Sequence, residues 1–433
     1  MNVLVILDYF EYFIPFSNQT GRIKYFYVTA CRKFLAKNIP NLSFCDLRNY
    51  YKLNNQVPKG DWRNYFKVTS VLGSVGYRVN FEGISAYIEN YFENYIRENE
   101  IKILISGGTT GFERCGIATA KRMRIKTYCV WEGFFRPNTI SIDPDGMNAE
   151  SSFCRKSFDE IIKHKPSEKF INFYEKYLHF LKNKGIDNRN LKNIQGLRFN
   201  IFHQIKNRWK DRKDFERIRL PFIQHIGARL SYYFFRNRYL RTDEISNPFI
   251  FFPLQTHTDS NIIINGEIFP FEKYVELILN AFLEVKNEIK CQLIIKEHPF
   301  DVFRKKYNRK VSKDILWLRP ETSIPDVLKN QFSIGTIVIN STSGLESLIL
   351  GKPVIALAKS VFSLKELTLI PDELKIMNVS RLLVQLRNQR VNADLIFQFA
   401  AYLFDTIQFE GDLNNYPSLE EIKDFETNYC QLN

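Results

Sequence analysis

The stretch that decides the fold runs from Gly335 to Leu357 and reads GTIVINSTSGLESLILGKPVIAL. Its first apolar, β-branched run, Thr336–Ile339, predicts a buried strand. The polar run Asn340–Gly344 predicts a turn, and the leucines of 345–350 predict a short helix that ends at a glycine. Val354–Leu357 then predicts the next strand of an α/β sheet.

Such a sequence of strand, polar turn and helix places free backbone N–H groups and small hydroxyls at a helix N-terminus. An anion binds readily at that position. An ordinary turn with a serine or threonine N-cap has the same pattern, and this stretch alone favours neither interpretation.

The composition is that of a globular protein with a strong positive charge. The chain has 433 residues, of which 45% are hydrophobic and 25% charged, so it is long enough for two or three domains. A net charge of +14 favours an acidic partner such as a nucleotide, a phosphorylated glycan or an anionic lipid surface. Nucleic acid is disfavoured because no recognisable nucleic-acid module appears.

The cysteines and the hydropathy predict a cytoplasmic protein. Seven cysteines are scattered without CxxC spacing, which fits a reducing cytosol and predicts neither disulfides nor a zinc site. The chain begins with a strand-like run and has no stretch of about 18 apolar residues, so we expect at most a peripheral membrane contact. Basic residues concentrate between Arg155 and Arg241, either as a solvated face or as a surface that docks on the inner face of the membrane.

Two series of alternating strands and helices follow one another. The first predicts strands at Asn2–Leu7, Leu42–Cys45, Lys102–Ser106 and Thr127–Trp131, and helices at Ile23–Lys37, Phe81–Asn99 and Phe112–Met123. The second predicts strands at Phe249–Leu254, Gln292–Lys296 and Ile315–Leu318 besides those above, and helices at Phe271–Asn287, Ala393–Ile407 and Ser418–Cys430. We therefore predict an α/β protein of the GT-B type, with two Rossmann-like domains facing a central cleft and with C-terminal helices.

The predicted domain boundary lies near Ser246. Residues 1–245 are the predicted acceptor-side domain, with a basic, mostly helical insert at about 155–241, and residues 246–433 are the predicted donor-binding domain with its closing helices. The long, turn-rich segment from Glu132 to Ser152 predicts a functional loop rather than a connector.

Two polar motifs follow predicted strands in the second half. Lys296-Glu-His-Pro299 comes where a strand ends, and a lysine and a histidine there can hold a phosphate while the proline fixes the turn. Gln255-Thr-His-Thr-Asp259 follows another strand, and Asp259 is either a helix N-cap or a carboxylate that faces the cleft.

Two further motifs lie in the first half. Glu132 has Arg136 close by, as an acid/base group with its neighbour or as a plain ion pair, and Arg136 can instead clamp a substrate carboxylate. Gly107-Gly-Thr-Thr-Gly111 resembles a phosphate loop but lacks the Lys-Ser/Thr end, so we interpret it as a turn or an acceptor-side element.

Taken together, these pieces resemble the bacterial capsule-polysaccharide synthesis family, the retaining β-Kdo glycosyltransferases of the KpsC, KpsS and WbbB type. The resemblance covers the middle and the C-terminal half, and the N-terminal part matches only in general character. It rests on four blocks in the family's order: Trp131–Pro137 with Gly146–Asn148 and Ser151, Pro253–Gln255 with Thr258–Ile262, Lys296–Pro299, and Asn340–Glu346 with Gly351–Pro353.

The resemblance implies transfer of Kdo from CMP-β-Kdo to a glycan or glycolipid acceptor of capsule or lipopolysaccharide, with retention and without a metal or other cofactor. It implies that Asp259 is the nucleophile and Glu132 the acid/base. Arg136 and Asn148 are the candidates for the substrate carboxylate or the acceptor. The candidates for donor binding are Lys296, His298, Pro299, Ser341, Thr342, Ser343, Glu346 and Gln255.

Two alternatives stay open. One is a GT-B transferase that uses another nucleotide sugar, such as CMP-sialic acid or a UDP-sugar. The other is a non-catalytic component of a polysaccharide export assembly that binds a glycan or a nucleotide.

Overall fold

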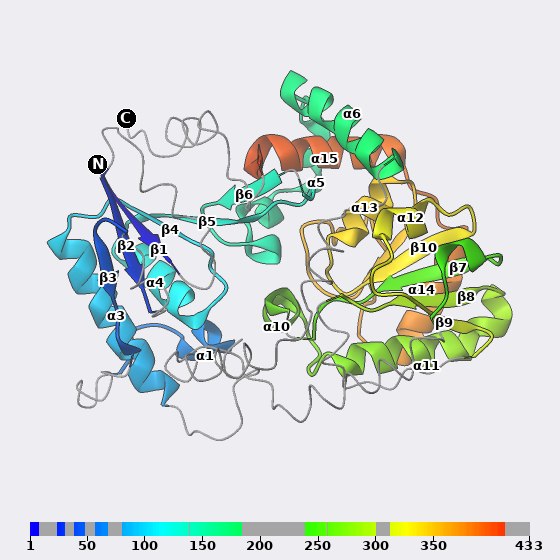
Figure 1. Cartoon of the computed structure of the whole chain (residues 1–433), viewed down its shortest axis with the longest axis horizontal. Coiled ribbons are helices and arrows are strands. Elements are labelled where there is room, and N and C mark those ends of the chain that lie inside the picture. The colour runs from blue at the N-terminus through cyan, green and yellow to red at the C-terminus, as the bar shows by residue number, and fades with distance from the viewer. Residues whose placement is uncertain are drawn as a thin grey trace, which may run out of the picture. The chain divides into compact units, whose positions relative to one another are not determined.

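The computed structural model describes residues 1–7, 24–30, 39–47, 57–67, 80–137, 139–183, 239–257, 259–299 and 312–411. They form two α/β units, shown in Figure 1. Among the described residues, the first unit holds those up to Arg155 together with 407–411, and the second holds 156–183 and 239–406. The predicted α/β fold class, with two Rossmann-like units, is confirmed. Within the described ranges, no helix is both long and apolar enough to cross a membrane.

The first unit is built on a seven-stranded sheet with the order β12-β6-β5-β4-β1-β2-β3. The five strands β3, β2, β1, β4 and β5 pair in parallel. β6 is antiparallel to both of its neighbours, β5 and β12. The strands are β1 (Asn2–Ile6), β2 (Lys24–Thr29), β3 (Leu42–Phe44), β4 (Ile103–Ser106), β5 (Lys126–Glu132), β6 (Thr139–Asp143) and β12 (Gln408–Glu410). The helices are α1 (Trp62–Tyr65), α3 (Phe81–Glu98) and α4 (Gly111–Arg122), with the short 3-10 turns η4 (Asn148–Glu150) and η5 (Ser152–Arg155).

The helix predicted at Ile23–Lys37 is wrong over its described part, because residues 24–29 form β2. The strand is buried on both faces: Tyr25 and Tyr27 pack into one cluster of the core, and Phe26 and Val28 pack into another. A strand in the interior of a sheet is apolar on both faces, so its side chains form a continuous apolar run. Over one or two helical turns, such a run cannot be distinguished from the apolar face of a helix.

The segment from Glu132 to Ser152 contains a strand that the sequence analysis missed. β6 returns antiparallel along β5, so that Glu132 pairs with Ile140 and Cys129 with Asp143. The turn residues of this segment therefore belong to a β-hairpin and to the loop after it, and the predicted long loop is corrected to these shorter pieces.

The second unit has a five-stranded parallel sheet with the order β11-β10-β7-β8-β9. Its strands are β7 (Phe249–Pro253), β8 (Gln292–Lys296), β9 (Ile315–Leu318), β10 (Ser333–Val338) and β11 (Val354–Ala356), and all were predicted within a few residues. Its helices are α5 (Phe158–Lys163), α6 (Glu168–Asn183), α10 (Ser260–Asn265), α11 (Glu272–Ile289), α12 (Ile324–Lys329), α13 (Ser343–Ile349), α14 (Ile376–Asn388) and α15 (Ala393–Ile407).

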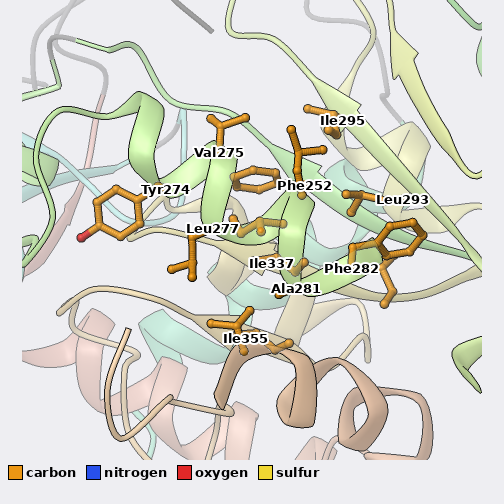
Figure 2. Packing of buried hydrophobic residues seen from close by; sticks show 14 of the residues in the cluster. Phe252, Tyr274, Val275, Leu277, Ala281, Phe282, Leu293, Ile295, Ile337 and Ile355 are labelled. Atoms are coloured by element: carbon orange, nitrogen blue, oxygen red, sulfur yellow. The ribbon is translucent and has the colours of Figure 1, made fainter. Parts of the chain in front are cut away.

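The core of the second unit forms between its sheet and α11 and α14. Figure 2 shows side chains from α11, among them Val275, Leu277 and Phe282, packed against Phe252 of β7 and Ile295 of β8. On the other face of the sheet, Phe249 and Phe251 pack against Val327 and Leu328 of α12. Burial of these apolar side chains on both faces holds the strands in register.

Helices α5 and α6 and strand β12 group differently from the predicted domain ranges of 1–245 and 246–433. Phe170 and Phe173 of α6 pack against Phe404 of α15, with ring centroids 5.6 and 4.5 Å apart, so α5 and α6 group with the second unit. β12 pairs with β6, so the chain re-enters the first sheet after α15. The helix predicted at 418–430 and residues 184–238 of the basic insert lie outside the described residues.

Gly344, the second residue of α13, lies close to Phe362 and to Val338 of β10. A Cβ at this position would meet Phe362 at 2.7 Å and Val338 at 3.0 Å. Gly351 ends the helix with φ +74°, and a Cβ there would meet nothing within 4 Å. The first glycine is therefore required by close packing, and the second by backbone conformation.

We predict that Gly344→Ala lowers the free energy of unfolding by about 1 to 3 kcal/mol, because the added methyl group overpacks a buried contact. Gly351→Asn is the control, since asparagine tolerates the left-handed conformation and the site is open. Thermal melts of both variants test this, and an unchanged midpoint for Gly344→Ala would contradict the packing.

Candidate functional site

Three neighbouring strands of the second unit end at one edge of the sheet. Pro253, the last residue of β7, pairs with Lys296, the last residue of β8, and the N–H of Leu254 donates to the carbonyl of Lys296 at 2.8 Å. β10 lies on the other side of β7 and leads into Asn340. The edge therefore brings together the polar residues that follow the three strands.

Gln255 connects two of these strand ends. Its side-chain NH₂ donates to Asp259 Oδ2 and to Asn340 Oδ1, both at 3.0 Å, and its Oε1 accepts the Asn340 backbone N–H at 3.2 Å. Asn340 in turn donates through Nδ2 to the carbonyl of Asn261 at 3.0 Å. Two blocks that are far apart in the sequence thus share one hydrogen-bond network.

Asp259 is the N-cap of α10. Its Oδ1 accepts the backbone N–H of Asn261 at 2.8 Å, and its Oδ2 accepts from Gln255. The side chain is half-buried. The N-cap interpretation is therefore confirmed.

The Ser341–Ser343 segment leads into α13, as predicted, and Ser343 is the first residue of the helix. Ser341 Oγ accepts from the N–H of Ser343 at 3.3 Å and from Ser343 Oγ at 2.8 Å. The N-cap position belongs to Thr342, whose side chain makes no capping hydrogen bond. Ser341, Thr342 and Glu346 are half-buried, whereas Ser343 is buried.

Lys296 carries a buried positive charge at the end of β8. The residue is 5% exposed, and burial lowers the pKa of its ammonium group from 10.5 to about 8, an effect that Glu321 and Glu297 partly offset. Its Nζ donates to the carbonyl of Glu297 at 3.4 Å, and no carboxylate in the described ranges lies within ion-pair distance of it. A buried ammonium group that forms no ion pair is costly, and an anionic ligand relieves that cost.

Glu297 and Tyr239 are residues that the sequence analysis did not single out. Glu297 is fully buried, and the Tyr239 hydroxyl donates a hydrogen bond to its carboxylate. Glu297 directly follows the last residue of β8, so this hydrogen bond fixes the chain where it leaves the strand. His298 and Pro299, which continue this turn, are half-buried.

In the first unit, Glu132 and Arg136 form an ion pair of 3.1 Å at the end of β5, and both side chains are about two-fifths exposed. Arg136 Nε also donates to the carbonyl of Gly133 at 3.3 Å. The contact fits both interpretations of this pair, and a partly exposed ion pair of this kind contributes little to stability.

Asn148 lies in a loop that a buried carboxylate organises. It begins η4 with φ +50°. Asp143, the last residue of β6, accepts hydrogen bonds from Ser151 Oγ at 2.5 Å and from the backbone N–H of Ser152 at 3.0 Å. Arg114 binds Glu150 with two parallel hydrogen bonds of 2.8 and 2.9 Å. The loop is thus held at both ends, and the aspartate before its turn was the signal that sequence reasoning missed.

The Gly107–Gly111 segment is a turn whose donors are already used. The carboxylate of Glu113 accepts from the N–H groups of Gly107, Thr109 and Thr110 at 2.9 to 3.1 Å, and from the Thr109 hydroxyl at 3.0 Å. Glu113 is 4% exposed and completes a capping box with Thr110. The chain's own carboxylate therefore occupies the position that a phosphate would take in a phosphate loop.

Comparison with known proteins shows similarity to proteins of capsule polysaccharide biosynthesis. The sequence model of a family described as "Capsule polysaccharide biosynthesis protein" matches residues 102–412. The "Capsule polysaccharide modification protein LipB" of Neisseria meningitidis serogroup A is 23% identical over 324 residues, which cover 70% of this chain and 74% of the relative. The "Capsule polysaccharide export protein KpsS" of Escherichia coli is 24% identical over 271 residues, which cover 58% of this chain and 64% of the relative. Among solved structures, the "KpsC, beta Kdo 2,4 transferase" of Thermosulfurimonas dismutans matches with a TM-score of 0.41 and 15% identity, over 79% of this chain and 88% of that one.

We predict that Glu113→Ala lowers the free energy of unfolding by about 2 to 4 kcal/mol, because it leaves buried backbone N–H groups without an acceptor. Glu82→Ala is the matched control, since Glu82 also lies in the first turn of a helix but is exposed. Denaturant unfolding followed by circular dichroism measures both, and equal effects would contradict the role given to Glu113.

Proposed function

The chain belongs to the capsule polysaccharide biosynthesis family, and on this premise we propose that it is a retaining glycosyltransferase that moves Kdo from CMP-β-Kdo to a glycan or glycolipid acceptor. The observation that carries the proposal is the buried cation Lys296, at a strand end beside the Gln255–Asn340 network. The choice of donor rests on the four sequence blocks that resemble β-Kdo transferases.

Lys296 suits an anionic donor. The phosphate of CMP replaces water as the partner of the ammonium group, and His298 and the hydroxyls of the Ser341–Ser343 turn offer further hydrogen bonds. A cation next to a phosphate leaving group stabilises the charge that develops when the glycosidic bond breaks. On this proposal Lys296 contributes both to donor affinity and to the departure of CMP, and no metal is assigned to the step.

Asp259 is assigned the first displacement. Its carboxylate attacks the anomeric carbon of Kdo, the bond from that carbon to the CMP phosphate breaks, and CMP leaves with the bonding electrons. The hydrogen bonds from Gln255 and from the Asn261 N–H hold the carboxylate in one orientation. The product of this step is an ester between Asp259 and Kdo.

Glu132 is assigned the second displacement. An acceptor hydroxyl attacks the same carbon, its proton passes to Glu132, and the bond to Asp259 breaks to restore the carboxylate. Two inversions at one carbon give retention overall, as in retaining glycosidases. Arg136 is assigned to the Kdo carboxylate or to the acceptor, and Asn148 to the acceptor. The proposed location is the cytoplasm, with the acceptor at the inner face of the membrane.

We predict that Asp259→Asn lowers transfer by about a thousandfold or more, because an amide cannot form the ester. Asparagine is an equally good N-cap, so α10 and the fold are expected to persist. CMP affinity, measured by calorimetry, is expected to stay within about threefold of that of the unsubstituted protein. Asp394→Asn, an exposed position in the first turn of α15, is the control.

The outcomes separate the possible functions of the site. Near-normal turnover by Asp259→Asn contradicts the nucleophile. Binding of CMP by the unsubstituted protein without release of CMP from CMP-β-Kdo favours a non-catalytic nucleotide-binding component. Tighter binding of UDP than of CMP favours a transferase with another donor.

We predict that CMP affinity falls as the pH rises from 7 to 9, because the Lys296 ammonium, whose pKa is about 8, loses its proton in this range. The phosphate monoester keeps its charge there, since its second pKa is about 6. Lys296→Met is expected to weaken CMP binding at pH 7 by about tenfold or more and to remove the pH dependence.

The same variant is expected to raise the free energy of unfolding at pH 7 by about 1 to 3 kcal/mol, because the folded protein no longer buries a charge. The exposed Lys273→Met is the matched control. A CMP affinity that stays constant from pH 7 to 9 in the unsubstituted protein would remove Lys296 from the phosphate site.

A further inference from the structure

We propose that Gln255 and Asn340 are positioning residues for Asp259, which together hold the carboxylate and the Ser341–Ser343 turn in one fixed arrangement. This inference rests on the proposed function, in which Asp259 is the nucleophile. It differs from the donor-binding role that the sequence analysis gave to Gln255, and it adds Asn340, to which no role was assigned.

The hydrogen bonds determine which way the Gln255 amide points. Its oxygen accepts the backbone N–H of Asn340, and only an oxygen can accept from that donor. The NH₂ group must therefore face the other side, where it donates to Asp259 Oδ2 and to Asn340 Oδ1. A flipped amide would place two donors against each other at Asn340 and an oxygen against the carboxylate.

Asn340 holds the other side of the nucleophile. Its oxygen accepts from Gln255, and its Nδ2 donates to the carbonyls of Asn261 and Lys359 at 3.0 and 3.5 Å. Asn261 lies in the first turn of α10, the helix that Asp259 caps. Asp259 is thus fixed directly by Gln255 and indirectly through the helix that Asn340 holds.

The burial of the two amides makes this arrangement rigid. Gln255 is 8% exposed and Asn340 is 3% exposed, so water does not compete strongly for their hydrogen bonds. Asn340 also continues directly into Ser341, so the network that orients the carboxylate includes the residue next to the turn. A reacting carboxylate must stay aligned with the anomeric carbon, and small misplacements are costly in rate.

The test uses the full chain with CMP-β-Kdo, protein in excess and no acceptor, and it measures the rate of CMP release. Gln255→Met keeps the size of the side chain and removes its hydrogen bonds. We expect CMP release to slow by about 10- to 100-fold. The dissociation constant of CMP is expected to change by no more than about threefold, because the phosphate ligands are intact.

A second variant tests the pH dependence of CMP release, which a purely structural role of Gln255 would leave unchanged. Gln255→Glu replaces the donor to Asp259 by a second carboxylate, and two carboxylates in contact do not both ionise readily. The pH profile of CMP release is therefore expected to shift to higher pH. Gln292→Glu is the matched control, since the Gln292 side chain donates to the carbonyl of Lys313 at the start of β8, the end of the strand opposite to Lys296.

The results distinguish this inference from the proposed function. If the unsubstituted protein neither binds CMP nor releases it from CMP-β-Kdo, the proposed function fails and this inference fails with it. If the unsubstituted protein releases CMP and Gln255→Met does so at the same rate, the proposed function stands and the positioning role is overturned. An unshifted pH profile for Gln255→Glu also overturns it.

Discussion

The contact on which the rest of the site depends is the pairing of two buried amides, Gln255 and Asn340, across neighbouring strand ends. A parallel sheet brings the carboxyl ends of all its strands to one edge, but it does not by itself orient the loops beyond those ends. Here the polar residues after β7 and β10 are locked together, and α10 and the turn before α13 are placed by the same network. The apolar packing of α11 and α14 against the sheet provides the rigid base for this edge.

The charges around them distinguish two loops that look alike in the sequence, Gly107–Gly111 and Asn340–Gly344. Both are short runs of glycine, serine and threonine after a strand. In the first unit, the carboxylate of Glu113 accepts hydrogen bonds from the backbone N–H groups of the Gly107–Gly111 turn. These N–H groups therefore already have an anionic partner within the chain. In the second unit, the buried Lys296 ends β8, which is separated from β10 by β7, and it forms no ion pair within the described ranges. The two glycine- and hydroxyl-rich loops therefore differ in charge: the first holds a buried carboxylate, and the second belongs to a sheet edge that carries a buried ammonium group.

Strands with polar residues on either side were predicted correctly, whereas strands that depend on tertiary contacts were not. Strands β8 and β9 were predicted with their observed bounds, because each is a short apolar run between polar residues. β2 was mistaken for a helix because its apolar residues follow one another without alternation. They do so because the strand is buried on both faces, which only the assembled sheet shows. β12 was missed because it is short and pairs with a distant strand, and β6 because the turn residues around it made the whole segment resemble a loop. At the site, an aspartate before serine and asparagine was identified as an N-cap or a reactive group, and the structure confirms the cap.

By itself, the sequence determined the fold class, most strands of the second sheet and the polar residues that follow them, because apolar periodicity and turn chemistry are local properties. Only the tertiary structure decided that Gln255 joins Asp259 to Asn340, that Glu113 occupies its own glycine turn, and that Tyr239 donates to Glu297. These contacts connect residues whose separation along the chain carries no information about distance in space. Burial then sets the strength of the hydrogen bonds and the pKa of the lysine, and burial is a property of the folded chain.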